Sequence, residues 1–170
     1  MKLKQVPEEL STVDLLIVLL LRFPEIFTIK YNLPETKFEL SFMLKSNPEK
    51  SRYIKFKESF DEAAKAYNEL AKLKTAVPKL SRKFIDSWVL LQVTWKKDNI
   101  TFEEVNLINQ IISNEFKNDL VLDSRVDEPL EKDLSFKEEF IEFLLSRKNE
   151  KNEENLFAFR EAGKVYVFDR

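Results

Sequence analysis

Basic and aromatic side chains alternate in one short stretch of this chain, from Lys50 to Lys57, and further cations follow in residues 72–83. In proteins that bind a nucleic-acid strand, cations pair with phosphates and aromatic rings stack on bases. This stretch therefore predicts contacts with RNA. The residues that would make those contacts are Lys50, Arg52, Tyr53, Lys55, Lys57, Lys79, Arg82 and Lys83.

The same stretch also has a purely structural interpretation, which we favour. Tyr53, Phe56 and Phe60 recur at helical spacing, which turns their rings toward a core and leaves the cations on a solvated helix face. One observation keeps RNA binding open, because cations in a first helical turn oppose the helix dipole and do not stabilise that helix. Against RNA, the net charge of −2 gives little general attraction for phosphate.

Paired carboxylates are the other residues that could do chemistry. Glu138 and Glu142 lie one helical turn apart, a spacing that places two oxygen ligands for Mg²⁺ or Ca²⁺ on one helix face. A hydrolase with two carboxylates needs its acids on opposite sides of a cleft, and no calcium-loop pattern is present. We therefore expect these acids to be solvated helix surface, with no metal and no cofactor bound.

Most other enzyme chemistry is excluded by composition. The chain has no His, no Cys and one Gly. Without His and Cys it has no Ser–His–Asp or Cys–His nucleophile and no conventional zinc, haem or iron–sulfur ligands. One glycine is too few for a phosphate-binding or dinucleotide-binding loop. The absence of Cys also suits a reducing compartment, so we expect a cytoplasmic protein.

Charge is unevenly distributed along the chain. Residues 45–83 hold 11 basic and 5 acidic residues, whereas residues 98–161 hold 8 basic and 17 acidic residues. A basic second quarter and an acidic second half are typical of a protein with oppositely charged surfaces, which can bind partners.

Apolar periodicity predicts an α+β domain over residues 1–170, with about five mostly antiparallel strands and about four helices. The strands are an N-terminal hairpin, an interior strand and a C-terminal hairpin that turns at Gly163. A helix follows a cap at Asn47, and a capping box beginning at Thr101 opens another. A charged linker is expected at about residues 123–134. The expected strands cover residues 27–31, 38–44, 88–95, 156–160 and 165–169, and the expected helices cover residues 13–22, 48–74, 101–118 and 135–145.

The most apolar segment, residues 15–21, has no polar side chain. Seven residues are too few to cross the ~30 Å hydrocarbon core of a bilayer, so we predict no membrane contact. A helix that is apolar on all sides belongs in a core or in a dimer interface, although a buried strand is an alternative. The candidate interface residues are Leu15, Leu16, Leu19 and Leu20.

Three hypotheses for function follow. The first is a non-enzymatic interaction or regulatory protein whose unidentified partner is another protein or a second copy of this chain. The second is an RNA- or ribosome-associated protein that uses the basic segment 50–83. The third, which we favour least, is a carboxylate- or Mg²⁺-dependent enzyme.

Overall fold

The computed structural model describes residues 8–32, 34–74, 76–96, 100–122, 155–161 and 163–169. Within these ranges the chain is α+β, as predicted, with one six-stranded sheet and three helices. The elements in chain order are α1 (Glu8–Arg22), β1 (Thr28–Asn32), β2 (Lys37–Leu44), α2 (Lys50–Leu70), β3 (Lys79–Ile85), β4 (Trp88–Lys96), α3 (Phe102–Phe116), β5 (Asn155–Glu161) and β6 (Lys164–Asp169). The expected linker at 123–134 and the expected helix at 135–145 lie outside the described residues.

The strand order is β3-β4-β2-β1-β5-β6, and every neighbouring pair is antiparallel. The two predicted hairpins are confirmed as β1–β2 and β5–β6, and Gly163 has the positive φ, 78°, that its turn requires. The predicted interior strand is confirmed as β4, which pairs with β2 on one side and with β3 on the other. The sixth strand, β3, was missed by the sequence analysis.

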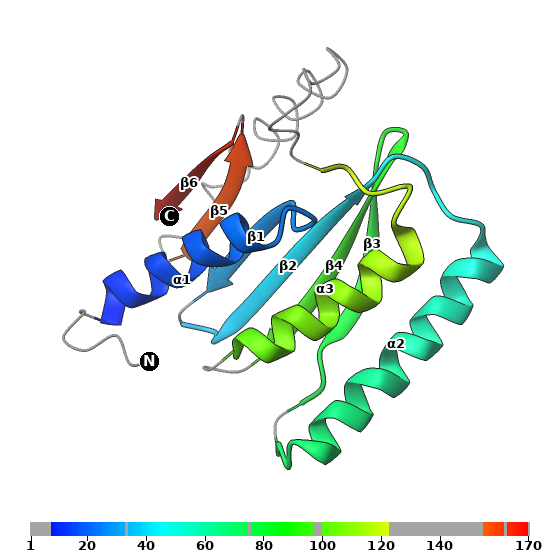
Figure 1. Ribbon diagram of the computed structural model, residues 1–170, viewed down its shortest axis with the longest axis horizontal. Coiled ribbons are helices and arrows are strands. Elements are labelled where there is room, and N and C mark those ends of the chain that lie inside the picture. Colours follow the sequence, from blue (N-terminus) through cyan, green and yellow to red (C-terminus); the bar gives the residue numbers. More distant parts are fainter. Residues whose placement is uncertain are drawn as a thin grey trace.

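The helices lie on one side of the sheet, with α1 beside β1, β5 and β6, α3 across β2 and β4, and α2 running next to β3 at the edge of the sheet (Figure 1). Alternate residues of each strand point toward these helices because successive side chains of a strand point to opposite faces. In β2, Leu40 and Phe42 point to the helices and are fully buried. They join Val93 of β4 and Phe60 of α2 in the main core.

The other sheet face carries a smaller apolar cluster. Met43 and Leu90 contribute to it from β2 and β4, and Phe157 and Phe159 contribute from β5. Val121 completes the cluster after α3, and its N–H donates to the carbonyl oxygen of Met43 at 2.8 Å. This face is therefore apolar where Met43 and Leu90 lie, and it becomes polar along the same strands at Ser41 and Gln92.

The helix α1 confirms the helical interpretation of residues 15–21 and excludes the strand alternative. Leu16, Leu19 and Leu20 are fully buried against the sheet, so these three candidate interface residues belong to the core of this chain. The outward side of α1 exposes the fourth candidate, Leu15, together with Val18 and Leu21. These side chains are 36%, 53% and 47% exposed, respectively. Among the described residues, no helix is long and apolar enough to cross a membrane.

Candidate interaction surface

The start of α2 sets the geometry of the basic segment. The expected cap at Asn47 is wrong, because α2 begins at Lys50 after the N-cap residue Glu49, which makes no side-chain capping bond. Tyr53, Phe56 and Phe60 face the core, as their spacing predicted, and Ala64 and Asn68 continue that face. The first turn holds no acidic residue that would favour the helix dipole.

A stack of three side chains joins α2 to β3. The guanidinium carbon of Arg82 lies 4.0 Å from the ring centroid of Tyr53 and 5.2 Å from that of Phe84. Arg82 also donates a hydrogen bond of 3.1 Å to the side-chain oxygen of Asn47. These contacts hold the guanidinium in one orientation, and cation–π attraction stabilises the arrangement.

Apolar side chains remain exposed around this stack. Phe84 is 56% exposed, and Ile54, which follows Tyr53 in α2, is 45% exposed. Lys50 and Lys57 lie about one helical turn before and after Tyr53, so they share its side of the helix. We call this region the α2–β3 surface, and its residues are Lys50, Tyr53, Ile54, Lys57, Arg82 and Phe84.

Burial and the charge of Arg82 act in opposite directions on the pKa of the Tyr53 hydroxyl. Burial raises the pKa of the Tyr53 hydroxyl above its ordinary value of 10.0, the positive charge of Arg82 lowers it, and Asp61 raises it. Tyr53 therefore stays protonated at neutral pH and acts here as a neutral ring under a cation.

Arg52 faces the opposite side of α2 and joins this helix to α3. Its Nε lies 2.9 Å from the Glu115 carboxylate, and its Nη1 lies 3.5 Å from that of Asp119. The guanidinium also donates to the backbone carbonyl of Glu115 and lies 4.9 Å from the ring centroid of Phe116. Arg52 is thus engaged with α3 and lies away from the α2–β3 surface.

The remaining predicted RNA contacts are spread over the molecule. Lys55 is exposed on the side of α2 opposite Tyr53. Lys79 and Lys83 alternate with Arg82 along β3, so they point to the sheet face that the helices do not cover. The structure therefore brings Tyr53 and Arg82 together near Lys50 and Lys57 and separates the other four residues from them.

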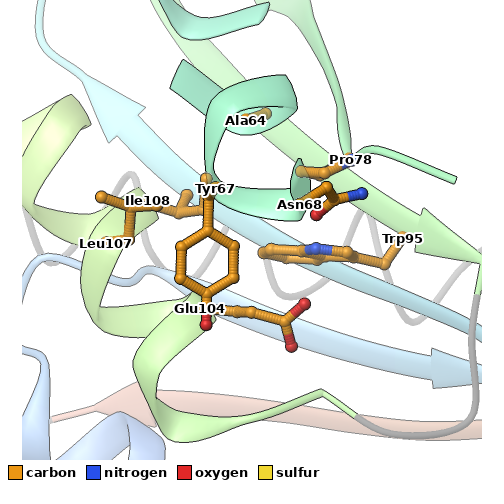
Figure 2. Close-up of a pocket in the computed structure, with 8 residues that line it drawn as sticks. All are labelled: Ala64, Tyr67, Asn68, Pro78, Trp95, Glu104, Leu107 and Ile108. Atoms are coloured by element: carbon orange, nitrogen blue, oxygen red, sulfur yellow. The ribbon is translucent and has the colours of Figure 1, made fainter. Parts of the chain in front are cut away.

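A small cavity lies between α2, α3 and β4 (Figure 2). It is lined by Ala64, Tyr67, Asn68, Pro78, Trp95, Glu104, Leu107 and Ile108. Its volume is about 10 Å³, the lower limit for one water molecule. The cavity is therefore too small to enclose more than one water molecule.

Each described carboxylate near this cavity already has a structural partner. Glu104, which is 3% exposed, accepts hydrogen bonds from the N–H and the hydroxyl of Thr101 at 2.8 and 3.0 Å, completing the capping box that the sequence predicted. Glu103 accepts a bond of 3.5 Å from the Tyr67 hydroxyl. No group of three or more acidic residues in the described part of the chain is arranged to hold a metal ion. Glu138 and Glu142 lie outside that part.

Sequence reasoning missed Phe84, Ile54 and Asn47 as members of the surface or its support. Phe84 sits in a strand whose apolar alternation is interrupted by cations, so no local pattern distinguished it. The exposed residues Val18 and Leu21 of α1 were missed because the whole segment is apolar and only packing decides which side is buried.

No protein-family model, curated protein or solved structure matches this chain.

Proposed function

We propose that this chain is a non-enzymatic protein-interaction module that binds a partner protein through the α2–β3 surface. The observation that carries the proposal is the fixed guanidinium of Arg82 between Tyr53 and the exposed ring of Phe84. Arginine and aromatic side chains are enriched at the centres of protein interfaces and carry much of their binding energy.

The geometry supports binding in two further ways. Arg82 is already held by two rings and Asn47, so little side-chain freedom is lost when a partner contacts it. Phe84, whose ring contacts the guanidinium, and Ile54, which follows Tyr53 in α2, are both exposed, and removing them from water in a complex would be favourable. As part of the same proposal we place the protein in the cytoplasm, where its cysteine-free sequence fits the reducing conditions.

The test uses two tagged variants, Phe84→Ser and Leu70→Ser, as baits in nuclease-treated lysate of the source cells. Both remove an exposed apolar side chain, since Leu70 at the end of α2 is 84% exposed. We expect a partner protein to be captured by the wild type and by Leu70→Ser and to be lost with Phe84→Ser. Equal capture by the two variants would show that the α2–β3 surface is not the site.

A second candidate function is RNA binding by the first two turns of α2. The observation that favours it is charge, because Lys50, Arg52, Lys55 and Lys57 all precede Glu58, the first acidic residue of the helix. The test is the double variant Lys55→Glu with Lys57→Glu, which leaves the contacts of Arg52 with α3 intact. Binding to oligouridine that falls steeply with salt and is lost in this variant would support RNA.

A second copy of the chain is the alternative protein partner. Leu15, Val18 and Leu21 form an exposed apolar strip on α1, which suits an interface between identical chains. Light scattering of the wild type and of a Val18→Glu variant tests this. A dimer that becomes a monomer in the variant would assign the interface to α1.

A further inference from the structure

We propose that the partner binds as an extended acidic segment that adds a seventh strand to the outer edge of β3. This inference rests on the proposed function, because it names the partner and its binding mode at the α2–β3 surface. Its basis is the position of β3 in the sheet, the charges on β3 and the placement of Arg82 and Phe84.

The outer edge of β3 has the backbone geometry for strand addition. On its inner side β3 pairs with β4 over its whole length, from Lys79 opposite Thr94 to Ile85 opposite Trp88. On its outer side no strand of the described residues pairs with it. An antiparallel strand directs alternate N–H and C=O groups outward at such an edge, where a peptide can bond to them.

The charges on β3 select the kind of strand that can bind. Its sequence, KLSRKFI, has three cations and no acid. Two copies of β3 would bring cations close to one another, and like charges on neighbouring strands are destabilising. Charged edge residues of this kind prevent edge-to-edge pairing between identical chains. An acidic strand would instead place carboxylates beside these cations, and opposite charges on neighbouring strands attract.

The side chains on the two faces of β3 specify the alternation expected in the partner. Residues of the added strand that point toward the helices would lie near Arg82 and Phe84, and residues that point the other way would lie near Lys79 and Lys83. Strand addition obtains affinity from backbone bonds and specificity from such alternating positions. The partner therefore carries acidic side chains on one face and apolar side chains next to Phe84 on the other.

The other edge of the sheet provides an internal comparison. The sequence of β6, KVYVFD, has one cation and one acid, so it lacks the charge bias of β3. An acidic peptide that binds by charge and backbone pairing should therefore choose β3 over β6.

The experiment uses the full chain and synthetic peptides of the length of β3, 7 residues. The probe alternates Val and Glu. One control replaces Glu with Lys, and another replaces alternate Val residues with Pro, which has no N–H to donate. Fluorescence anisotropy at low salt measures affinity, and hydrogen exchange followed by NMR reports which amides become protected.

We expect the Val–Glu peptide to bind and to slow amide exchange in β3 but not in β6, and neither control peptide to bind. Phe84→Ser should weaken binding by about tenfold, whereas Leu70→Ser should not. Lys79→Glu should weaken it more than Lys55→Glu, although both variants change the net charge equally. This comparison separates local charge at β3 from general attraction.

Four results would overturn the inference. Equal binding of the proline peptide, or protection of β6, would rule out strand addition at β3 while leaving side-chain binding at the α2–β3 surface intact. If oligouridine displaces the peptide and Lys55→Glu abolishes the binding of oligouridine, the site would be assigned to RNA. A Phe84-dependent dimer in light scattering would make a second copy the occupant. The proposed function itself fails if Phe84→Ser and Leu70→Ser capture the same proteins, or if the site is assigned to RNA.

Discussion

The guanidinium group of Arg160 donates a hydrogen bond of 2.9 Å to the backbone carbonyl of Phe23, just beyond the end of α1. The same group donates to the carbonyls of Pro24 and Ile26 at 3.2 and 3.1 Å and to the carbonyl of Leu20. The last carbonyls of a helix have no partner within it, and they lie at the negative end of its dipole. One buried cation from β5 thus satisfies both the end of α1 and the loop that follows.

Replacing Arg160 by Met should lower the free energy of unfolding by about 2–4 kcal/mol, because buried carbonyls then lose their donors. Arg160→Lys should cost less, because it keeps the charge with fewer directed donors. Urea unfolding monitored by circular dichroism measures both variants. A Met variant with an unchanged midpoint would show that these carbonyls find other partners.

The two sides of α1 should respond differently to truncation. Leu19 is fully buried, so Leu19→Ala should cost about 2–5 kcal/mol by leaving a cavity in the core. Val18 is 53% exposed, so Val18→Ala should change stability by about 0.5 kcal/mol or less. Thermal unfolding of the two variants checks this difference. Similar losses would mean that Val18 is covered in solution, which would favour an interface on α1.

The capping box of α3 should contribute measurably to stability. Thr101→Ala removes the oxygen that accepts the N–H of Glu104 at 3.2 Å and should cost about 1 kcal/mol. Thr101→Ser keeps that oxygen and is the matched control. If chemical denaturation shows equal midpoints for the two variants, the hydroxyl does not stabilise the helix.

Tyr53 should make stability fall at alkaline pH. Its pKa is raised in the folded state, mainly by burial, so the folded protein holds this proton more tightly than the unfolded chain does. The stabilising effect is complete below the unfolded value of 10.0 and is lost as pH rises through the folded value. The wild type should therefore lose more stability than Tyr53→Phe above about pH 10.

The charge on Arg82 should alter this titration in a defined direction. Arg82 lowers the pKa of Tyr53, so Arg82→Met should raise it further. Ultraviolet absorbance of tyrosinate, with Tyr53→Phe subtracted, measures the shift. A pKa that falls in the Met variant would contradict the stacked geometry.

The features that sequence predicted are those set by short-range patterns. Alternating residues identified the β1–β2 and β5–β6 hairpins, and the spacing of Thr101 and Glu104 identified the start of α3. The strand β3 was missed because only Leu80 within it is buried and cations occupy positions between its apolar residues. Its strand conformation comes from pairing with β4, which is a tertiary effect on local propensity.

The candidate site likewise has one feature that sequence spacing predicts and others that only packing brings together. Helical spacing predicted that Tyr53 is buried at the start of α2, and the structure confirms it. The stack of Arg82 on Tyr53 joins residues from two elements, and Asn47 supports it from a third position in the chain. Such contacts depend on how α2 lies against β3, and no spacing within one segment encodes that packing.

The contact between Arg160 and the end of α1 also has a consequence for synthesis on the ribosome. The two partners in the Phe23 bond are 137 residues apart in sequence. During synthesis α1 is therefore made long before Arg160, which donates to its final carbonyls. The strand β1 is likewise made long before β5, with which it pairs. We expect chains truncated before Arg160 and released from the ribosome to expose α1 to protease, and the full chain to protect it. Until β5 has been made, the leucines of α1 that are buried in the folded protein are exposed, and a chaperone would need to cover them.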